Sequence, residues 1–244
     1  MKRYSEITKS EEIYKLAKLD EECYCLITPT GRFLYEAIID VDPEVETIIQ
    51  KVKEVKNKIF QCTSIDSIIS MLNKLLASRK IKFGFTRGLL NEYIAYGGFI
   101  PSTQELTFIF TSKIQDFIDK DIDKNVEFKQ FLNSLQRPLG HELIHREQFL
   151  KVAYEEKRKE IFKKSSSIKD KYYSNKHEMM SYAWQIINEF RMNGIEDSSI
   201  KKILATKSEV KLEIGGPILK DYHKYFPGQE VLKGLYKYMY MYLD

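Results

Sequence analysis

The stretch LGHELIHREQ (139–148) restricts the fold of this chain more than any other feature of its sequence. It contains His141 and His145, half of the four histidines in 244 residues, with Glu142 directly after the first of them. Residues four apart differ by about 40° around an α-helix, so a helix here directs both imidazoles to one side. The leucines and the isoleucine of the stretch give the same helix an apolar side. We therefore expect a helix that is anchored in the core and carries a histidine pair.

The histidine pair predicts a metal site. Two imidazoles on one helical face have the geometry of two ligands of a tetrahedral zinc ion. Glu142 lies on the adjacent strip of the helix and can take a proton from a water molecule, whose pKa zinc lowers toward about 7. The HExxH pattern thus combines two ligands, His141 and His145, with a general base. The alternative is an ordinary helix in which both histidines form hydrogen bonds.

A catalytic zinc ion usually takes three protein ligands and a water, so a third ligand is needed. No glycine and further histidine follow His145 at the spacing that would place three histidine ligands close together in sequence. The best segment is YYSNKHEMMSYAW (172–184), because a second helix there can return over the first. Glu178 is the preferred ligand, His177 is its rival, and His223 or another acidic residue stays open. A glutamate near a helix start also suits the helix dipole, so a purely structural role for it remains the alternative.

The segments before residue 81 are predicted mostly as helices. Residues 1–22 place apolar side chains at helical spacing, and 23–39 read as two short strands around a Pro-Thr-Gly turn. Asp42-Pro43 predicts the start of a helix that runs to about residue 59. A further helix is expected over 64–78, where isoleucine and leucine recur at intervals of three and four.

The pattern changes to strands near residue 81. IKFGFTR (81–87), NEYIAYGGFIP (91–101) and ELTFIFT (105–111) alternate aromatic and β-branched residues, and the last two are expected to form a hairpin across Gly97–Gln104. The Gly97-Gly98 pair lacks a phosphate-binding motif and is interpreted as the bend of this hairpin.

Helices are predicted for the rest of the chain. Proline is tolerated in the first turn of a helix and not in its middle, so the HELIH helix is expected to begin near Pro138 and to end near residue 162. KKSSSIKDK (163–171) is interpreted as a loop. Another helix covers about 176–192 and stops at Asn193-Gly194, a common helix end.

Composition narrows the class of protein. A 43% share of hydrophobic residues supplies a core, 30% charged residues fit a soluble domain, and a net charge of +4 is too mild to indicate a nucleic-acid partner. The three cysteines fit no disulfide or redox motif and are interpreted as free thiols. No signal peptide and no membrane-length apolar run are evident, so we expect a protein that is cytoplasmic or is packaged by something made in the cytoplasm.

HELIH followed by Y-x-x-x-x-E-x-x-[SA]-Y-A resembles the zincin-like metallopeptidases encoded by bacteriophages and low-GC genomes. It follows the gluzincin pattern, in which a glutamate from a later helix joins HExxH. The resemblance covers about residues 81–193, and Ser181 stands where alanine is more usual. The residues that carry it are His141, Glu142, His145, Tyr173, Glu178, Tyr182 and Ala183.

The resemblance implies an α+β fold in which a small antiparallel or mixed sheet precedes the HExxH helix and a mostly helical C-terminal part follows. Residues 81–244 would be the zincin-like catalytic domain, and 1–80 a mostly helical accessory region or part of one continuous fold. The edge strand of the sheet would bind extended peptide, and ELTFIFT is assigned to that edge. Tyr173, or its neighbour Tyr172, is a candidate for stabilising an oxyanion, with an aromatic packing role as the alternative.

The sequence therefore predicts a zinc metallopeptidase. Zn²⁺ is held by His141, His145 and Glu178, while Glu142 acts first as general base and then as proton donor to the leaving amine. The expected partner is a protein or peptide substrate, with no membrane or nucleic acid involved, and the oligomeric state stays open. Two alternatives remain: a phage-related binding or structural protein that keeps the fold without activity, and a metal-dependent hydrolase of a non-peptide substrate.

Overall fold

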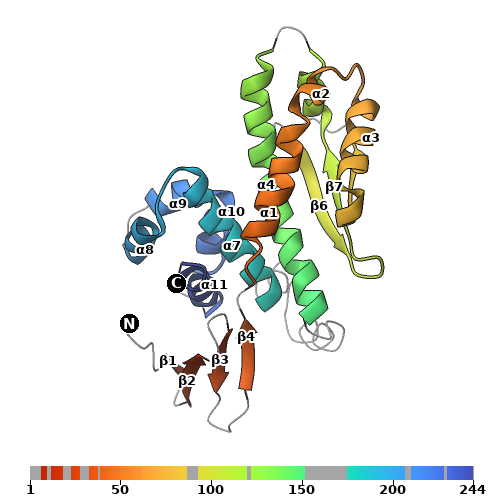
Figure 1. The fold of residues 1–244 in the computed structure, drawn as a ribbon. Coiled ribbons are helices and arrows are strands. Elements are labelled where there is room, and N and C mark those ends of the chain that lie inside the picture. The colour runs from red at the N-terminus through yellow and green to blue at the C-terminus, as the bar shows by residue number, and fades with distance from the viewer. Residues whose placement is uncertain are drawn as a thin grey trace. The chain divides into compact units, whose positions relative to one another are not determined.

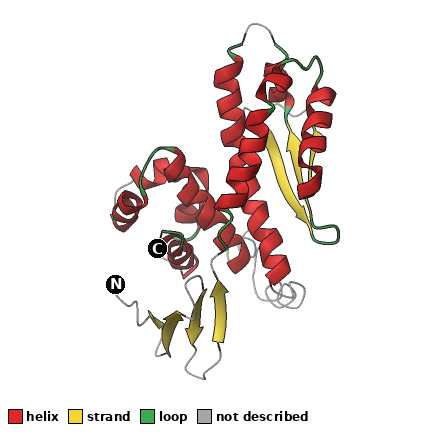
Figure 2. Cartoon of the chain, in the orientation of Figure 1, coloured by secondary structure: helices red, strands yellow, loops and turns green. Residues whose placement is uncertain are grey.

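The computed structural model has an α+β fold, in which a long helix lies beside a small sheet and further helices follow (Figures 1 and 2). The strands within residues 7–37 are described by their backbone alone. The described residues are 7–9, 12–18, 23–27, 33–37, 39–86, 93–119, 122–151, 175–206, 210–227 and 230–243.

The chain divides into two compact units, residues 1–40 and residues 41–244. The boundary predicted from the sequence, at residue 80, lies inside the second unit. The helices between 41 and 80 belong to the second unit because they pack on it: α1 (Asp42–Glu54) contacts the long helix α4 (Lys124–Lys151), and α3 (Ile65–Leu76) contacts strand β5 (Ile81–Phe85).

The first unit contains an antiparallel sheet in the order β1-β2-β3-β4. The hairpin predicted within residues 23–39 is confirmed, since β3 pairs with β4. The helix predicted for residues 1–22 is wrong, because β1 and β2 lie there. A segment of seven residues is too short to be stable as a helix by itself, whereas a neighbouring strand satisfies its backbone groups directly. The strands are β1 (Ile7–Lys9), β2 (Glu12–Lys18), β3 (Cys23–Ile27) and β4 (Phe33–Ala37).

The second unit begins with helices close to the predicted ones. Pro43 lies in the first turn of α1, and the helix expected to reach residue 59 is interrupted at Val55, after which α2 (Lys56–Phe60) follows. Ser64 caps α3 by accepting a hydrogen bond from the backbone N–H of Ser67. A short 3-10 helix, η1 (Ala77–Arg79), then leads into the sheet.

The sheet of the second unit has the order β5-β7-β6, with β7 (Glu105–Phe110) parallel to β5 and antiparallel to β6 (Ile94–Ile100). The predicted β6–β7 hairpin is confirmed, but its turn covers 101–104, and Gly97 and Gly98 lie inside β6 rather than in the bend.

The assignment of ELTFIFT to the sheet edge is wrong, because β7 is the central strand. Its alternate side chains Leu106, Phe108 and Phe110 are fully buried, and a strand with so much apolar area to bury gains most from the centre. The edge beside α4 is β6, which carries the exposed Tyr96.

Helix α4 begins at Lys124, so the expectation that it starts near Pro138 is wrong. Proline costs the helix one backbone hydrogen bond at this point. The helix continues because its remaining length packs on β6, on α1 and on α7 (Lys176–Met192). Its predicted continuation beyond Lys151 to residue 162, and the predicted loop at 163–171, lie outside the described residues.

The predicted helix 176–192 is confirmed as α7, whose end is marked by Gly194 in the left-handed region, with φ of 76°. No helix in the described ranges has the length and apolar character needed to cross a membrane. The remaining helices are η2 (Ser112–Phe117), α8 (Asp197–Ala205), α9 (Val210–Ile214), α10 (Gly216–Tyr225) and α11 (Glu230–Met241).

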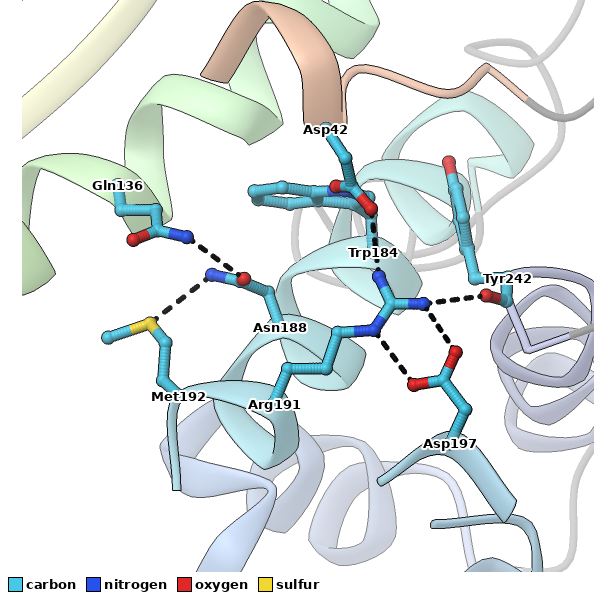
Figure 3. Close-up of polar contacts among 8 residues, drawn as sticks. All are labelled: Asp42, Gln136, Trp184, Asn188, Arg191, Met192, Asp197 and Tyr242. Atoms are coloured by element: carbon cyan, nitrogen blue, oxygen red, sulfur yellow. Dashed lines mark hydrogen bonds and ion pairs between the residues drawn. The ribbon is translucent and has the colours of Figure 1, made fainter. Parts of the chain in front are cut away.

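A polar network holds α7 against its neighbours (Figure 3). Arg191 donates to Asp42 at the start of α1, to Asp197 at the start of α8 and to the carbonyl of Tyr242 near the C-terminus. The indole N–H of Trp184 donates to the other oxygen of Asp42, at 2.7 Å. One helix is therefore tied to three separate parts of the unit.

Candidate metal centre

His141 and His145 lie on the inner face of α4, and both side chains are buried. Their position follows from the apolar side of the HELIH stretch, because Leu139, Leu143 and Ile144 are fully buried in the core. Packing these three residues fixes the rotation of the helix about its axis. The histidine pair is consequently directed at the neighbouring helix α7.

Glu178 reaches the histidines from the first turn of α7. Asn175 caps this helix by accepting a hydrogen bond from the backbone N–H of His177 at 3.0 Å. The two helices come close because Gly140 has no side chain: a Cβ atom built there would lie 1.9 Å from the ring of Trp184. The glycine before HELIH therefore allows the approach that places Glu178 beside the pair.

Three ligand atoms converge at this crossing. The Nε2 atoms of His141 and His145 are 3.0 Å apart, and Oε2 of Glu178 lies 3.4 Å from the first and 3.3 Å from the second. Ligand atoms about 2.0–2.1 Å from a tetrahedral zinc ion are themselves about 3.3 Å apart. The three separations thus fit a single zinc ion between the side chains.

The hydrogen bonding of these groups also fits a cation. Oε2 of Glu178 and Nδ1 of His141 are buried and form no hydrogen bond with the described residues. Buried polar atoms are normally paired, and an unpaired one costs about 1–3 kcal/mol. A cation at the convergence point would satisfy the carboxylate oxygen, and its donor set of two imidazoles and one carboxylate is one that zinc prefers.

Gln148 holds His145 in the orientation that the site needs. Its Oε1 lies 3.0 Å from Nδ1 of His145, and its Nε2 donates to the backbone carbonyl of His177 at 3.1 Å. The amide oxygen accepts the proton of Nδ1, which leaves the lone pair of Nε2 directed toward Glu178. The buried glutamine therefore links one candidate ligand to the residue that precedes another.

The charges at the crossing shift the pKa values of its groups in opposite directions. Burial alone would raise the pKa of Glu178, but the two imidazoles outweigh it and hold that pKa far below its usual range. Burial alone would lower the pKa of His145, but Glu178 outweighs it and the pKa is raised. A carboxylate that stays ionised beside both rings is ready to bind a cation.

Glu142 lies next to the ligand atoms on α4 without belonging to their cluster. Burial raises the pKa of its carboxyl group, an effect that the neighbouring His141 partly offsets. It also accepts a hydrogen bond from the backbone N–H of Phe99 on the edge strand β6. A buried carboxylate with a raised pKa, between the histidine pair and a sheet edge, has the properties of a general base.

A cavity of about 420 Å³ opens beside His141 and Glu142. Its walls come from the first half of β6, from α4, from α7 and from the start of α10. Tyr182, whose ring packs on that of His141 with centroids 4.7 Å apart, lines it too. One candidate ligand, His141, and the candidate base Glu142 thus line a space that can hold part of a small molecule or peptide.

The structure does not bring every predicted site residue to this place. His177 and His223 are not part of the cluster, and His223 contacts the hydroxyl of Tyr236 at 2.8 Å instead. Tyr173 and its neighbour Tyr172 lie outside the described residues.

Other residues at this site went unnoticed in the sequence. Gln148, three residues after His145, offered a weak signal for its role, and Gly140 offered none because its close contact is with a distant tryptophan.

Comparisons of the chain with family models, with curated proteins and with solved structures found no match. The resemblance to zincin-like metallopeptidases therefore rests on the HELIH stretch and the later segment that holds Glu178, Tyr182 and Ala183.

Proposed function

We propose that the unit formed by residues 41–244 is a zinc-dependent metallopeptidase of zincin-like fold. The observation that carries the proposal is the convergence of Nε2 of His141, Nε2 of His145 and Oε2 of Glu178 at separations of 3.0–3.4 Å. These three residues would hold the zinc ion, as the HExxH pattern and the separate glutamate led us to expect. A zinc ion bound there supplies a Lewis acid that polarises a carbonyl group and acidifies a water molecule.

Glu142 has the position and the environment of the general base. Burial raises the pKa of its carboxyl group, which favours proton uptake, and the side chain accepts a hydrogen bond from the backbone of β6. In the proposed reaction it takes the proton of the attacking water and then gives it to the leaving amine. The bond that breaks is the peptide C–N bond, and water is the only other reactant.

The substrate would bind as an added strand on β6, the edge strand beside α4, and not on β7. Antiparallel pairing is the more stable arrangement per residue, so we expect the peptide to run opposite to β6. Gly97 lies close to Pro138 of α4, so the strand and the helix leave no room for a larger side chain between them at that point. The scissile peptide would then lie near Glu142, where the Phe99 N–H meets its carboxylate.

The test is a comparison of zinc content and peptide cleavage in three proteins. Wild type, Glu142→Gln and Glu147→Gln are purified, their zinc is measured by elemental analysis, and each is incubated with a peptide mixture that mass spectrometry reads for new termini. Glu147 is a matched control on the same helix, with no part in the cluster. We expect about one zinc per chain in all three, cleavage by wild type and Glu147→Gln, and cleavage at least about 100-fold slower in Glu142→Gln.

Other results would point to the alternatives. Zinc in all three proteins without any cleavage would favour a binding or structural protein, or a hydrolase of non-peptide substrates. Zinc that remains after His145→Ala and Glu178→Gln substitutions would contradict the ligand set itself. Equal cleavage by wild type and Glu142→Gln would overturn the role of the base and leave the zinc site standing.

A further inference from the structure

The cavity beside the metal centre extends toward the beginning of β6. Three contacts show that β6 and α4 run in the same direction. The N–H of Ile94 donates to Oγ of Ser134 at 3.3 Å, Gly97 lies against Pro138, and the N–H of Phe99 bonds Glu142. The cavity is lined by residues 94–97 of the strand, so it lies before Glu142 in that direction. A peptide that pairs antiparallel with β6 places the residues after its scissile bond in this cavity.

One cation in the cavity wall has an unusual arrangement. Arg137 lies one helical turn before His141, and Glu189 of α7 binds it with both carboxylate oxygens. Its Nη2 donates to Oε2 of Glu189 at 2.9 Å, and its Nε contacts Oε1. The side chain of Glu189 is only 11% exposed, whereas that of Arg137 is 37% exposed. The guanidinium is thus clamped from behind by a buried acid and is partly open in front.

The clamp leaves donors for a ligand. Within the described part of the chain, Nη1 of Arg137 has no hydrogen-bond partner, and a guanidinium has five N–H groups in a fixed plane. Holding that plane rigid before binding removes much of the entropy cost of ordering an arginine. This arrangement suits a carboxylate, which can accept two parallel hydrogen bonds.

We propose that Arg137, clamped by Glu189, forms a subsite that binds a carboxylate group of the substrate on the C-terminal side of the cleaved bond. The inference rests on the proposed peptidase function and specifies its substrates. The carboxylate belongs to an Asp or Glu side chain within two residues of the cut, or to a free C-terminus at the same distance. Arg137 therefore determines specificity and takes no part in the chemical step.

A basic substrate residue is the less favourable occupant. Both carboxylate oxygens of Glu189 already contact Arg137, so they are poorly placed to bind the ammonium group of a substrate lysine. An ammonium group would also have to approach the guanidinium, and like charges repel. The remaining wall is mixed, because apolar residues such as Ile186 and Ile218 stand beside Ser134 and Gln185. The charge that a ligand meets first is that of the arginine.

The test profiles cleavage sites with wild type and with Arg137→Gln/Glu189→Gln, a double variant that leaves no buried charge unpaired. Both zinc-loaded proteins are incubated with a proteome-derived peptide mixture, half of it amidated so that its carboxyl groups are neutral. For wild type we expect cuts to concentrate before a carboxylate and to fall roughly tenfold or more after amidation. The double variant should lose this preference while it still cleaves. The position of each cut distinguishes a side chain from a free C-terminus as the source.

A matched control removes the exposed pair Lys233 and Glu230 on α11 and should leave the preference unchanged. The proposal is overturned if wild type shows no preference for a carboxylate, if it prefers lysine or arginine, or if the double variant keeps the preference of wild type.

A binding measurement separates this proposal from the proposed function. Glutarate is titrated by calorimetry into zinc-loaded wild type and into the double variant. We expect wild type to bind glutarate roughly tenfold more tightly, because Arg137 donates hydrogen bonds to a carboxylate of this ligand. A carboxylate that contacted only zinc would bind both proteins alike. Equal affinities overturn the subsite. Tighter binding by wild type without cleavage of any peptide counts against the peptidase and supports the subsite.

Discussion

Single side chains decide whether the candidate ligand atoms of this protein meet. Gln148 uses one end of its amide for His145 and the other for the backbone beside Glu178, so it couples the two helices at the site. Gly140 acts by the absence of a side chain, since the ring of Trp184 occupies the space that a Cβ atom would need. Neither residue is itself a candidate ligand, yet both affect the distances between the ligand atoms of His141, His145 and Glu178.

Replacing Gln148 with Leu should weaken zinc binding by about 10- to 100-fold, because His145 loses the acceptor that fixes its proton on Nδ1. The affinity is measured by competition with a chromogenic chelator. Gln130→Leu is the control, since Gln130 lies exposed on the same helix, far along it from the site. Equal zinc affinity in wild type and Gln148→Leu would show that the glutamine only fills space.

Replacing Gly140 with Ala should destabilise the fold by about 1–3 kcal/mol, because α4 and α7 must move apart to admit the methyl group. Urea unfolding measures the loss, and a chelator assay should show weaker zinc binding as Glu178 withdraws. Gly234→Ala is the control: a Cβ atom there meets only the flexible Met179 at 3.3 Å, and alanine favours a helix. If Gly140→Ala were as stable as wild type, the close crossing of the helices would be refuted.

At the scale of elements, α7 organises the second unit. It crosses α4 at the candidate metal centre, packs on α11, and is tied by Arg191 to the starts of α1 and α8 (Figure 3). The hydrogen bonds from Arg191 lower the pKa of Asp197 below its usual value. An acid with a lowered pKa in the folded state stabilises the fold above its unfolded pKa of about 3.9 and loses that contribution as the pH falls further.

Asp197→Asn should therefore unfold at a lower temperature than wild type near pH 7, and the difference should narrow as the pH falls below about 4. Thermal unfolding followed by circular dichroism from pH 7 to pH 3 measures both curves. Asp221→Asn on α10, for which no ion pair occurs among the described residues, is the matched control and should unfold like wild type near pH 7. A constant gap between wild type and Asp197→Asn down to pH 3 would mean that the ion pair with Arg191 contributes nothing.

At the scale of the molecule, the candidate ligands and the cavity all belong to the unit that starts at residue 41. The helices between 41 and 80 contribute to this unit directly. Asp42 accepts hydrogen bonds from Trp184 and Arg191, and Glu44 pairs with Arg146, which follows His145. The helix that carries the histidines is thus supported by residues of the segment that the sequence predicted to be an accessory region.

A chain that begins at Val41 should fold and bind zinc as tightly as the full chain. A chain that begins at Ile81 should not, because Trp184 and Arg146 lose their acidic partners, Arg191 loses Asp42, and β5 loses the cover of α3. Circular dichroism and the chelator assay measure both proteins. Zinc binding by the chain that begins at Ile81 would place the domain boundary at residue 80. If the chain that begins at Val41 did not fold or bind zinc, residues 1–40 would be needed to support the site.

Local patterns in the sequence predicted much of the fold. Helical spacing located α3, the Asn193-Gly194 stop located the end of α7, and the alternation of aromatic and β-branched residues located the hairpin of β6 and β7. These patterns work because a helix or a strand repeats its environment every few residues. They failed for residues 1–22 and for the start of α4, where strand pairing and helix packing outweighed the local spacing and the proline.

The sequence by itself determined the chemistry that this protein can offer: two imidazoles on one helical face, a carboxylate between them, and a second carboxylate at the start of a later helix. Only the tertiary structure decided that Oε2 of Glu178 lies 3.3–3.4 Å from both rings, that β6 is the strand at the edge beside them, and that Gln148 and Arg137 belong to the site. The reason is physical. Side-chain type and helical period are local properties, whereas the meeting of distant segments depends on which of them bury the most apolar surface together.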